Sequence, residues 1–136
     1  MAGFASYSMA NEILNFFYRG VPITIGANLY LRLLVAPSNR SGGGTETTYG
    51  GYERLALLRG ATIFGANANG KILNAIELEF PNPTTVGNGN LVAFDIVDTP
   101  TGAFTKVYNG GPISPAKAVV VGKPPRFRVG ALEITF

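Results

Sequence analysis

The chain has 136 residues, with eleven basic and eight acidic side chains and neither cysteine nor histidine. This length suits one hydrophobic core, and the two missing residue types exclude disulfides, thiolate zinc sites, cysteine nucleophiles and histidine-based triads. Charged residues make up only 14% of the chain, against roughly 25% in ordinary soluble domains. Because contact surfaces are depleted in Lys, Glu and Asp, we expect copies of the chain or a partner to cover part of the surface.

The net charge of +3 is spread along the whole chain. The closest basic grouping is Arg126 and Arg128 beside Lys123, which indicates a solvated strand face and not a nucleic-acid interface. No apolar run approaches the roughly 20 residues needed to cross a bilayer, and the N-terminus does not resemble a signal peptide. We therefore expect neither nucleic acid nor a membrane as a partner, and synthesis in the cytoplasm.

The first predicted element is a helix over residues 8–19, with Ser8 as its N-cap and Gly20 ending it in a left-handed conformation. Helical spacing puts four apolar side chains on one stripe. These are Met9, Ile13, Phe16 and Phe17. The stripe is expected either to pack on the sheet edge of its own domain or to dock on a neighbouring subunit.

From Val21 onward the apolar period changes to two, and Gly or Pro clusters separate short segments, which is typical of a β-sandwich. Strands are expected at residues 29–36, 52–59, 62–64, 71–80, 91–98, 103–109, 116–121 and 126–136. The fifth and sixth of these are predicted to form a hairpin through a tight turn at 99–102. The prediction is one mainly β domain over residues 1–136, an antiparallel sandwich or jelly roll of about eight strands with one N-terminal helix.

The connections between strands are long, at residues 37–51, 81–90 and 110–115. Long loops in compact domains are usually functional or mobile. Gly42–Gly44 lacks the lysine and hydroxyl of a phosphate-binding loop, so we predict a flexible loop there. Asn69-Gly70 predicts a tight turn, since both residues tolerate positive φ.

The carboxylates do not predict a catalytic or metal site. Glu77 and Glu79 lie on one strand, whereas glycosidases need two carboxylates facing each other roughly 5–10 Å apart, and hard cations need six or more oxygens. An ion-paired or solvated face is expected instead, with Arg54 or Lys71 as cross-strand partners. We assign no catalytic, cofactor-binding or metal-binding residue and expect no enzyme activity.

Several motifs resemble a family of small virion proteins of tailed phages. They are NEILN at 11–15, RG at 19–20, LYLRLL at 29–34, GYER at 51–54, EFP at 79–81, FDIVD at 94–98 with TG at 101–102, and FRVGALEITF at 127–136. The family includes jelly-roll capsid cement (decoration) proteins of short-tailed phages, such as one infecting Bordetella, and relatives often described as tail-fibre proteins. The glycine-rich segment at 41–44 and the lead at 1–7 depart from the family's pattern.

The resemblance implies a homodimeric protein on the capsid exterior of the virion, bound to the major capsid protein and stabilising the assembled shell. Loop length, charge and the helix stripe independently suggest candidate subunit or capsid contacts at Met9, Ile13, Phe16, Phe17, Arg40, Lys117 and Lys123. The main alternative is a tail or tail-fibre component that recognises the host surface. A free binding module and a hydrolase are the weaker alternatives.

Overall fold

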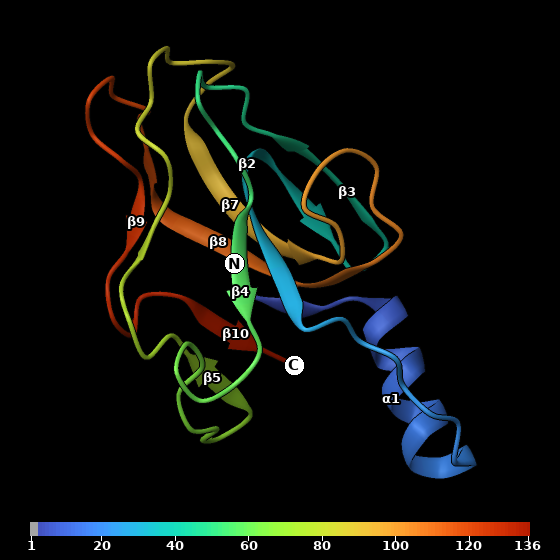
Figure 1. The fold of residues 1–136 in the computed structure, drawn as a ribbon. Helices are drawn as coiled ribbons and strands as arrows, with labels where there is room; N and C mark the ends of the chain where they lie inside the picture. Colours follow the sequence, from blue (N-terminus) through green and yellow to red (C-terminus); the bar gives the residue numbers. More distant parts are fainter. Residues whose placement is uncertain (1–2) are drawn as a thin grey trace.

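The computed structural model describes residues 3–136, so residues 1 and 2 of the predicted domain lie outside the described part. The fold is mainly antiparallel β with one N-terminal helix, as predicted. A large twisted sheet forms one layer, shorter strands pack against it, and the helix projects from one end of the body (Figure 1).

The main sheet has six strands, and all of its pairs are antiparallel. Its order is β1 (Phe4–Ala5), β8 (Val107–Lys117), β7 (Leu91–Val97), β2 (Asn28–Asn39) and β3 (Gly42–Glu46), and β4 (Leu55–Leu58) also pairs with β2. The predicted hairpin is confirmed as β7–β8. Its connection is a longer loop, residues 98–106, where a tight turn was predicted.

The second layer consists of two separate ribbons. They are β5 (Lys71–Leu73) with β10 (Glu133–Thr135), and β6 (Leu78–Glu79) with β9 (Arg126–Phe127). The hydrophobic core lies between this layer and the main sheet, where Leu31 and Leu33 of β2 meet Phe80, Phe94 and Phe127. The Phe127 ring packs edge-on against Phe94, with 5.8 Å between ring centroids.

Two glycine-rich segments predicted as loops are strands. Gly42–Gly44 lies in β3, where its backbone pairs with the end of β2. Gly110 and Gly111 lie inside β8, and a Cβ at Gly110 would stand 2.6 Å from the Phe4 ring. Glycine is therefore required for close packing at Gly110, but it gives no side-chain alternation from which a strand could be predicted.

Two long predicted strands are divided. Residues 71–80 form β5 and β6, and residues 126–136 form β9 and β10. The buried Asn74 lies at the break: its amide nitrogen donates to the Ile76 carbonyl (2.7 Å) and the Arg128 carbonyl (2.9 Å), and its Oδ1 accepts from the Leu132 amide (2.9 Å). One side chain thus replaces the backbone pairing that a continuous strand would have.

Three other predicted strands are shorter or absent. The strand predicted at 52–59 is reduced to β4, and residues 62–64 hold only a bridge from Phe64 to Asn74. The strand predicted at 116–121 is not formed, because β8 already covers residues 116 and 117 and ends at Lys117. The predicted turn at Asn69-Gly70 is confirmed, with φ of 53° and 75°.

The helix α1 (Tyr7–Arg19) begins one residue earlier than predicted. Ser6 is its N-cap, and the Ser6 hydroxyl accepts a hydrogen bond from the Met9 amide at 3.0 Å. The assignment of Ser8 as cap is wrong because Ser8 already lies in the first turn. Gly20 ends the helix in the left-handed conformation, as predicted.

Replacing Asn74 with alanine should destabilise the fold by about 2–3 kcal/mol, because it leaves buried backbone donors and acceptors without partners. Urea unfolding followed by circular dichroism measures this change. Asn67→Ala, at an exposed asparagine, is the matched control and should have little effect. Equal effects of the two changes would contradict the bracing role of Asn74.

Candidate functional site

A buried ion pair joins the two central strands of the main sheet. Arg32 on β2 and Asp95 on β7 are direct cross-strand partners, 4% and 0% exposed. The Arg32 guanidinium donates from Nε to Oδ1 at 2.7 Å and from Nη2 to Oδ2 at 2.6 Å. Such a two-bond fork fixes both side chains and strengthens each hydrogen bond.

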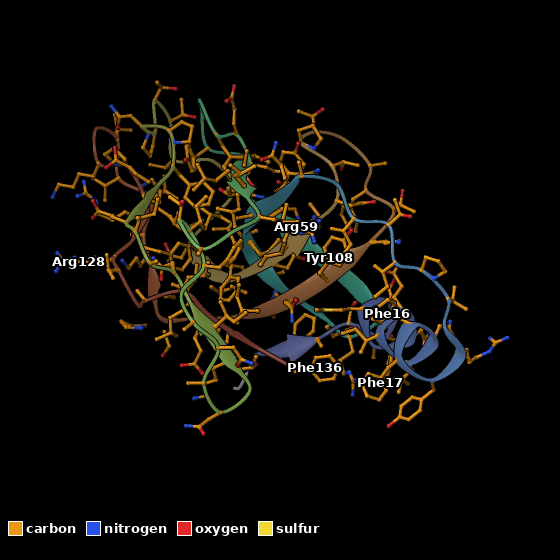
Figure 2. The ribbon with its side chains drawn as sticks, turned by 60° about the horizontal axis from the view of Figure 1, so that its bottom comes forward. Phe16, Phe17, Arg59, Tyr108, Arg128 and Phe136 are labelled. Carbon is orange, nitrogen blue, oxygen red and sulfur yellow. The ribbon has the colours of Figure 1, made fainter. Side chains whose placement is uncertain are left out.

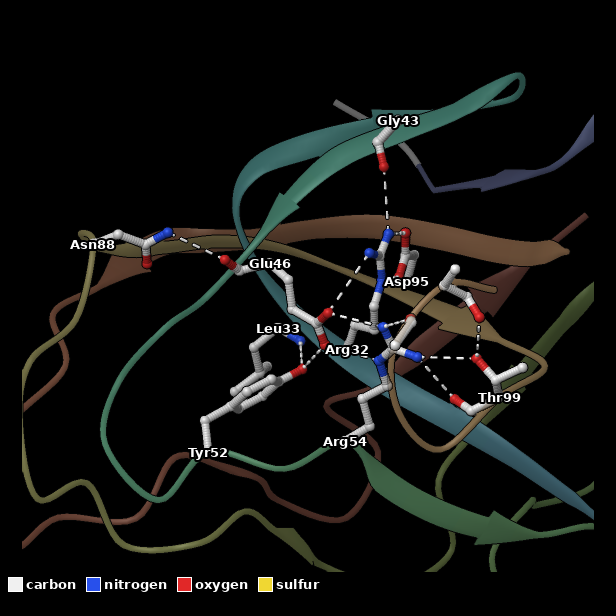
Figure 3. A network of polar contacts seen from close by, with 11 residues as sticks. Arg32, Leu33, Gly43, Glu46, Tyr52, Arg54, Asn88, Asp95 and Thr99 are labelled. Atoms are coloured by element: carbon white, nitrogen blue, oxygen red, sulfur yellow. Dashed lines mark hydrogen bonds and ion pairs between the residues drawn. The ribbon is translucent and has the colours of Figure 1, made fainter. Parts of the chain in front are cut away.

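A second fork lies beside the first (Figure 3). Arg54 donates to both oxygens of Glu46, at 2.9 and 3.0 Å, and the Tyr52 hydroxyl donates to Oε2 of Glu46 at 2.6 Å. Arg54 also donates to the carbonyls of Thr99 (3.0 Å) and Gly102 (2.8 Å). The two forks together, hereafter the charge network, fasten β2, β3, β7 and loop 98–106 to one another.

The pKa shifts in this network favour its charged form. Burial alone would raise the pKa of Glu46, but hydrogen bonds from Arg54 and Tyr52 outweigh burial and hold this pKa below its ordinary value. Burial, and then the Glu46 carboxylate, raise the pKa of Tyr52. The hydrogen bond to Glu46 raises the pKa of Arg54. At neutral pH Glu46 is therefore an anion held between donors, which suits a structural clamp.

The sequence does not predict this network. Asp95 and Asp98 are close in sequence but have different roles: Asp95 pairs with Arg32, and Asp98 accepts hydrogen bonds from the amides of Thr105 (3.0 Å) and Lys106 (3.1 Å) and shapes the loop. The signal in the sequence was Arg32, which is a cation within the apolar run 29–35. A buried strand can hold such a cation only if an anion lies beside it.

The predicted ion-paired face at Glu77 and Glu79 is confirmed, but its predicted partners are wrong. Arg126 pairs with both carboxylates, at 3.4 and 3.5 Å. Lys71 pairs with Glu133 at 3.0 Å, while Arg54 belongs to the charge network. The antiparallel pairing of β6 with β9 brings Arg126 beside Glu79.

The predicted helix stripe serves two different roles. Met9 packs against the core, and Ile13 is half-buried. Phe16 and Phe17 are 54% and 74% exposed and lie on the helix at the rim of the molecule (Figure 2). The body side of α1 is fixed further by an ion pair between Glu12 and Lys106 of loop 98–106. Packing on the domain's own body therefore holds only for the first part of the stripe.

Other apolar side chains cover the side of α1 that points away from the body. At 3.6 residues per turn, four exposed residues share this side, which we call the outward face. They are Tyr7, Leu14, Phe17 and Tyr18. The Phe17 and Tyr18 rings meet edge to face at 5.0 Å between centroids.

Arg40, predicted as a partner contact, fastens the start of α1. Its Nε donates to the Ala5 carbonyl at 3.0 Å, and its guanidinium lies 4.5 Å from the centroid of the Tyr7 ring. Its own carbonyl accepts from the Tyr7 amide at 2.8 Å. Arg40, although exposed, thus fastens Tyr7 and the start of α1 to the rest of the domain.

Lys117 and Lys123 are exposed and line one hollow near β9. This region lies at the other end of the molecule from α1, as the positions of Arg128 and Phe17 in Figure 2 show. The structure therefore divides the predicted contact residues between two separate surfaces.

Residues 4–135 match the family model of the podophage GP4 fiber I protein gp80. The chain belongs to this family. It is therefore a structural protein of the phage particle, in agreement with the virion family that the sequence motifs indicate. No curated protein matches the chain.

Two further findings concern the described residues of this family member. Within residues 3–136, no helix is long and apolar enough to cross a membrane. The same residues contain no group of three or more His, Cys, Asp or Glu side chains placed to hold a metal ion.

Replacing Asp95 with asparagine should cost about 3–5 kcal/mol of stability, because it leaves the buried Arg32 cation without an anion. Glu133→Gln, which breaks the exposed pair with Lys71, should change stability by less than about 0.5 kcal/mol. Thermal and urea unfolding of both variants measure the difference. Comparable losses would mean that Arg32 is not held by Asp95.

The stabilising effect of Glu46 should depend on pH. A carboxylate whose folded pKa is depressed contributes fully above its unfolded pKa, about 4.3, and loses that contribution as pH falls through the folded value. The stability gap between the parent and Glu46→Gln should therefore be constant from about pH 6 to 8 and shrink below about pH 4. Urea unfolding across this range measures the gap, and a gap that widens on acidification would contradict this assignment.

Proposed function

We propose that this protein is a repeated structural subunit of a podophage fibre and that it assembles with a second copy through the outward face of α1. The family name supports a fibre component. The observation that carries the assembly step is the orientation of α1, whose polar Glu12 faces the body while large apolar side chains face away from it.

Met9 of α1 packs against the core, but the outward face of the same helix is apolar, which is unusual for a helix on an isolated domain. Surface helices normally turn their apolar side to the core and their polar side to water. Here Leu14, Phe17 and Tyr18 of the outward face are 53%, 74% and 76% exposed. Such exposure is unfavourable in water, and it is relieved when a second surface covers the helix.

The area of the outward face suits self-association. With roughly 150–250 Å² for each aromatic side chain, its exposed part amounts to about 500 Å², the larger share of the ~800 Å² that one partner contributes to a standard interface. The four residues are uncharged, although the Arg40 guanidinium lies over the Tyr7 ring, so two copies can meet through Leu14, Phe17 and Tyr18 without like charges in contact. A two-fold pairing of this kind forms a homodimer, because the same patch serves both subunits.

Capsid decoration is the second candidate function. The order of motifs from NEILN to FRVGALEITF, which resembles that of cement proteins, favours it. In that role the protein would bind the major capsid protein on the exterior of the assembled shell, and many modest contacts would combine into a large stabilisation. Both candidates are structural, and neither includes catalysis, a cofactor, nucleic acid or a membrane.

The self-association step is tested by placing charge on the outward face. The parent protein should sediment as a dimer at micromolar concentration, and a Phe17→Glu, Tyr18→Glu double variant should sediment as a monomer, because paired glutamates would be desolvated at the interface. The fold should survive, since both residues are exposed.

Val86→Glu, at another exposed apolar residue, is the control and should remain dimeric. Circular dichroism checks that the fold is kept in each variant. A parent protein that stays monomeric at 100 micromolar or above would contradict the self-association step, and so would a control that dissociates to the same extent.

A further inference from the structure

A groove opens between the end of β8 and β9, far from α1. In the register of the main sheet Leu91 faces Lys117 and Ala93 faces Pro112, so that one residue of β7 opposes four residues of β8, 113–116. This large bulge interrupts the pairing of β7 with β8. Bulges of this kind occur often beside functional sites, where they re-aim side chains.

The groove has an apolar floor. It encloses about 400 Å³, and its floor is formed by Leu33, Leu91, Ile113 and Phe127. Three of these belong to the hydrophobic core and are at most 9% exposed, so the groove reaches the interior. A second hollow of about 420 Å³ shares Leu91, Lys117, Pro125 and Arg126 with it and extends the groove toward Lys123.

The rim of the groove is basic. Lys117, Arg126 and Arg128 line the first hollow, and Lys123 lines the second. Arg126 pairs with Glu77 and Glu79, but within residues 3–136 no salt bridge involves Lys117, Lys123 or Arg128. Elsewhere in the chain Arg32, Arg54, Lys71 and Lys106 each have an acidic partner. Arg19, Arg40 and Arg59 also lack an acidic partner, but their side chains donate hydrogen bonds to Asn15 or to backbone carbonyls. Within residues 3–136, the cations at this groove without an acidic partner therefore keep their donors free for a ligand.

We propose that the groove binds an extended segment of another protein that combines acidic with apolar side chains. Carboxylates of such a segment would form charge-assisted hydrogen bonds with Lys117, Lys123 and Arg128. Its apolar side chains would cover Leu91, Ile113 and Phe127, which a purely ionic partner would leave in water. The inference is independent of α1, so each surface can fail its test while the other stands.

The test uses a fluorescent peptide of about ten residues in which Glu alternates with Leu, long enough to span the groove when extended. We expect saturable binding by fluorescence anisotropy, with affinity falling as salt rises. Lys117→Glu and Arg128→Glu should each weaken binding by about fivefold or more. Arg19→Glu is the control of equal charge change; its side chain lies on α1, far from the groove, and hydrogen-bonds to Asn15, and it should leave affinity unchanged.

Two further measurements address the apolar floor. Ala131 is exposed and lines the groove, so Ala131→Trp should block the groove and abolish binding without altering net charge. A peptide with Ser in place of Leu should bind at least tenfold more weakly. The proposal is overturned if no saturable binding occurs below about 1 mM, if Arg19→Glu weakens binding as much as Arg128→Glu, or if the Ser peptide or an oligonucleotide binds as tightly as the Leu peptide.

Discussion

The buried pair of Arg32 and Asp95 is the constraint on which the rest of the structure depends. A buried guanidinium is tolerated only opposite an anion, and this pairing fixes the register between β2 and β7 at the centre of the main sheet. Arg32 also approaches Glu46 at 3.9 Å, and Glu46 holds Arg54, which binds loop 98–106. Through Lys106 the same loop reaches Glu12 of α1. Charge interactions therefore link the core of the sheet to the base of the projecting helix.

With these charges paired inside the molecule, the two surfaces that we propose as contacts differ sharply in character. Arg32, Asp95, Glu46 and Arg54 interact with one another inside the molecule, and Leu14, Phe17 and Tyr18 on the outward face of α1 are uncharged. At the opposite end, cations without acidic partners surround the groove beside β9. We propose that the apolar helix face at one end and the basic groove at the other bind two different neighbours, as a repeated component of a particle would require.

The elements that the sequence predicted are those whose signals are local. Gly20 ended the helix where expected, and the alternating apolar residues of β2 and β7 marked the central strands. The missed features depend on distant partners or on absent side chains. Asp95 lies 63 residues from Arg32, Asn74 meets Arg128 across 54 residues, and the Gly42–Gly44 strand has no side chains to alternate. Of the candidate contacts, Phe16 and Phe17 are exposed as a contact requires. Met9 packs against the core, and the exposed Arg40 binds the chain at Ala5 and Tyr7.

The central claim is that the protein is a fibre subunit that assembles through α1. A cryo-electron microscopy reconstruction of the podophage particle tests it most directly. The account predicts density for this fold along a fibre, with the outward faces of two α1 helices in contact. Copies arranged over the capsid shell, with Phe17 and Tyr18 exposed to solvent, would contradict it and favour the decoration role.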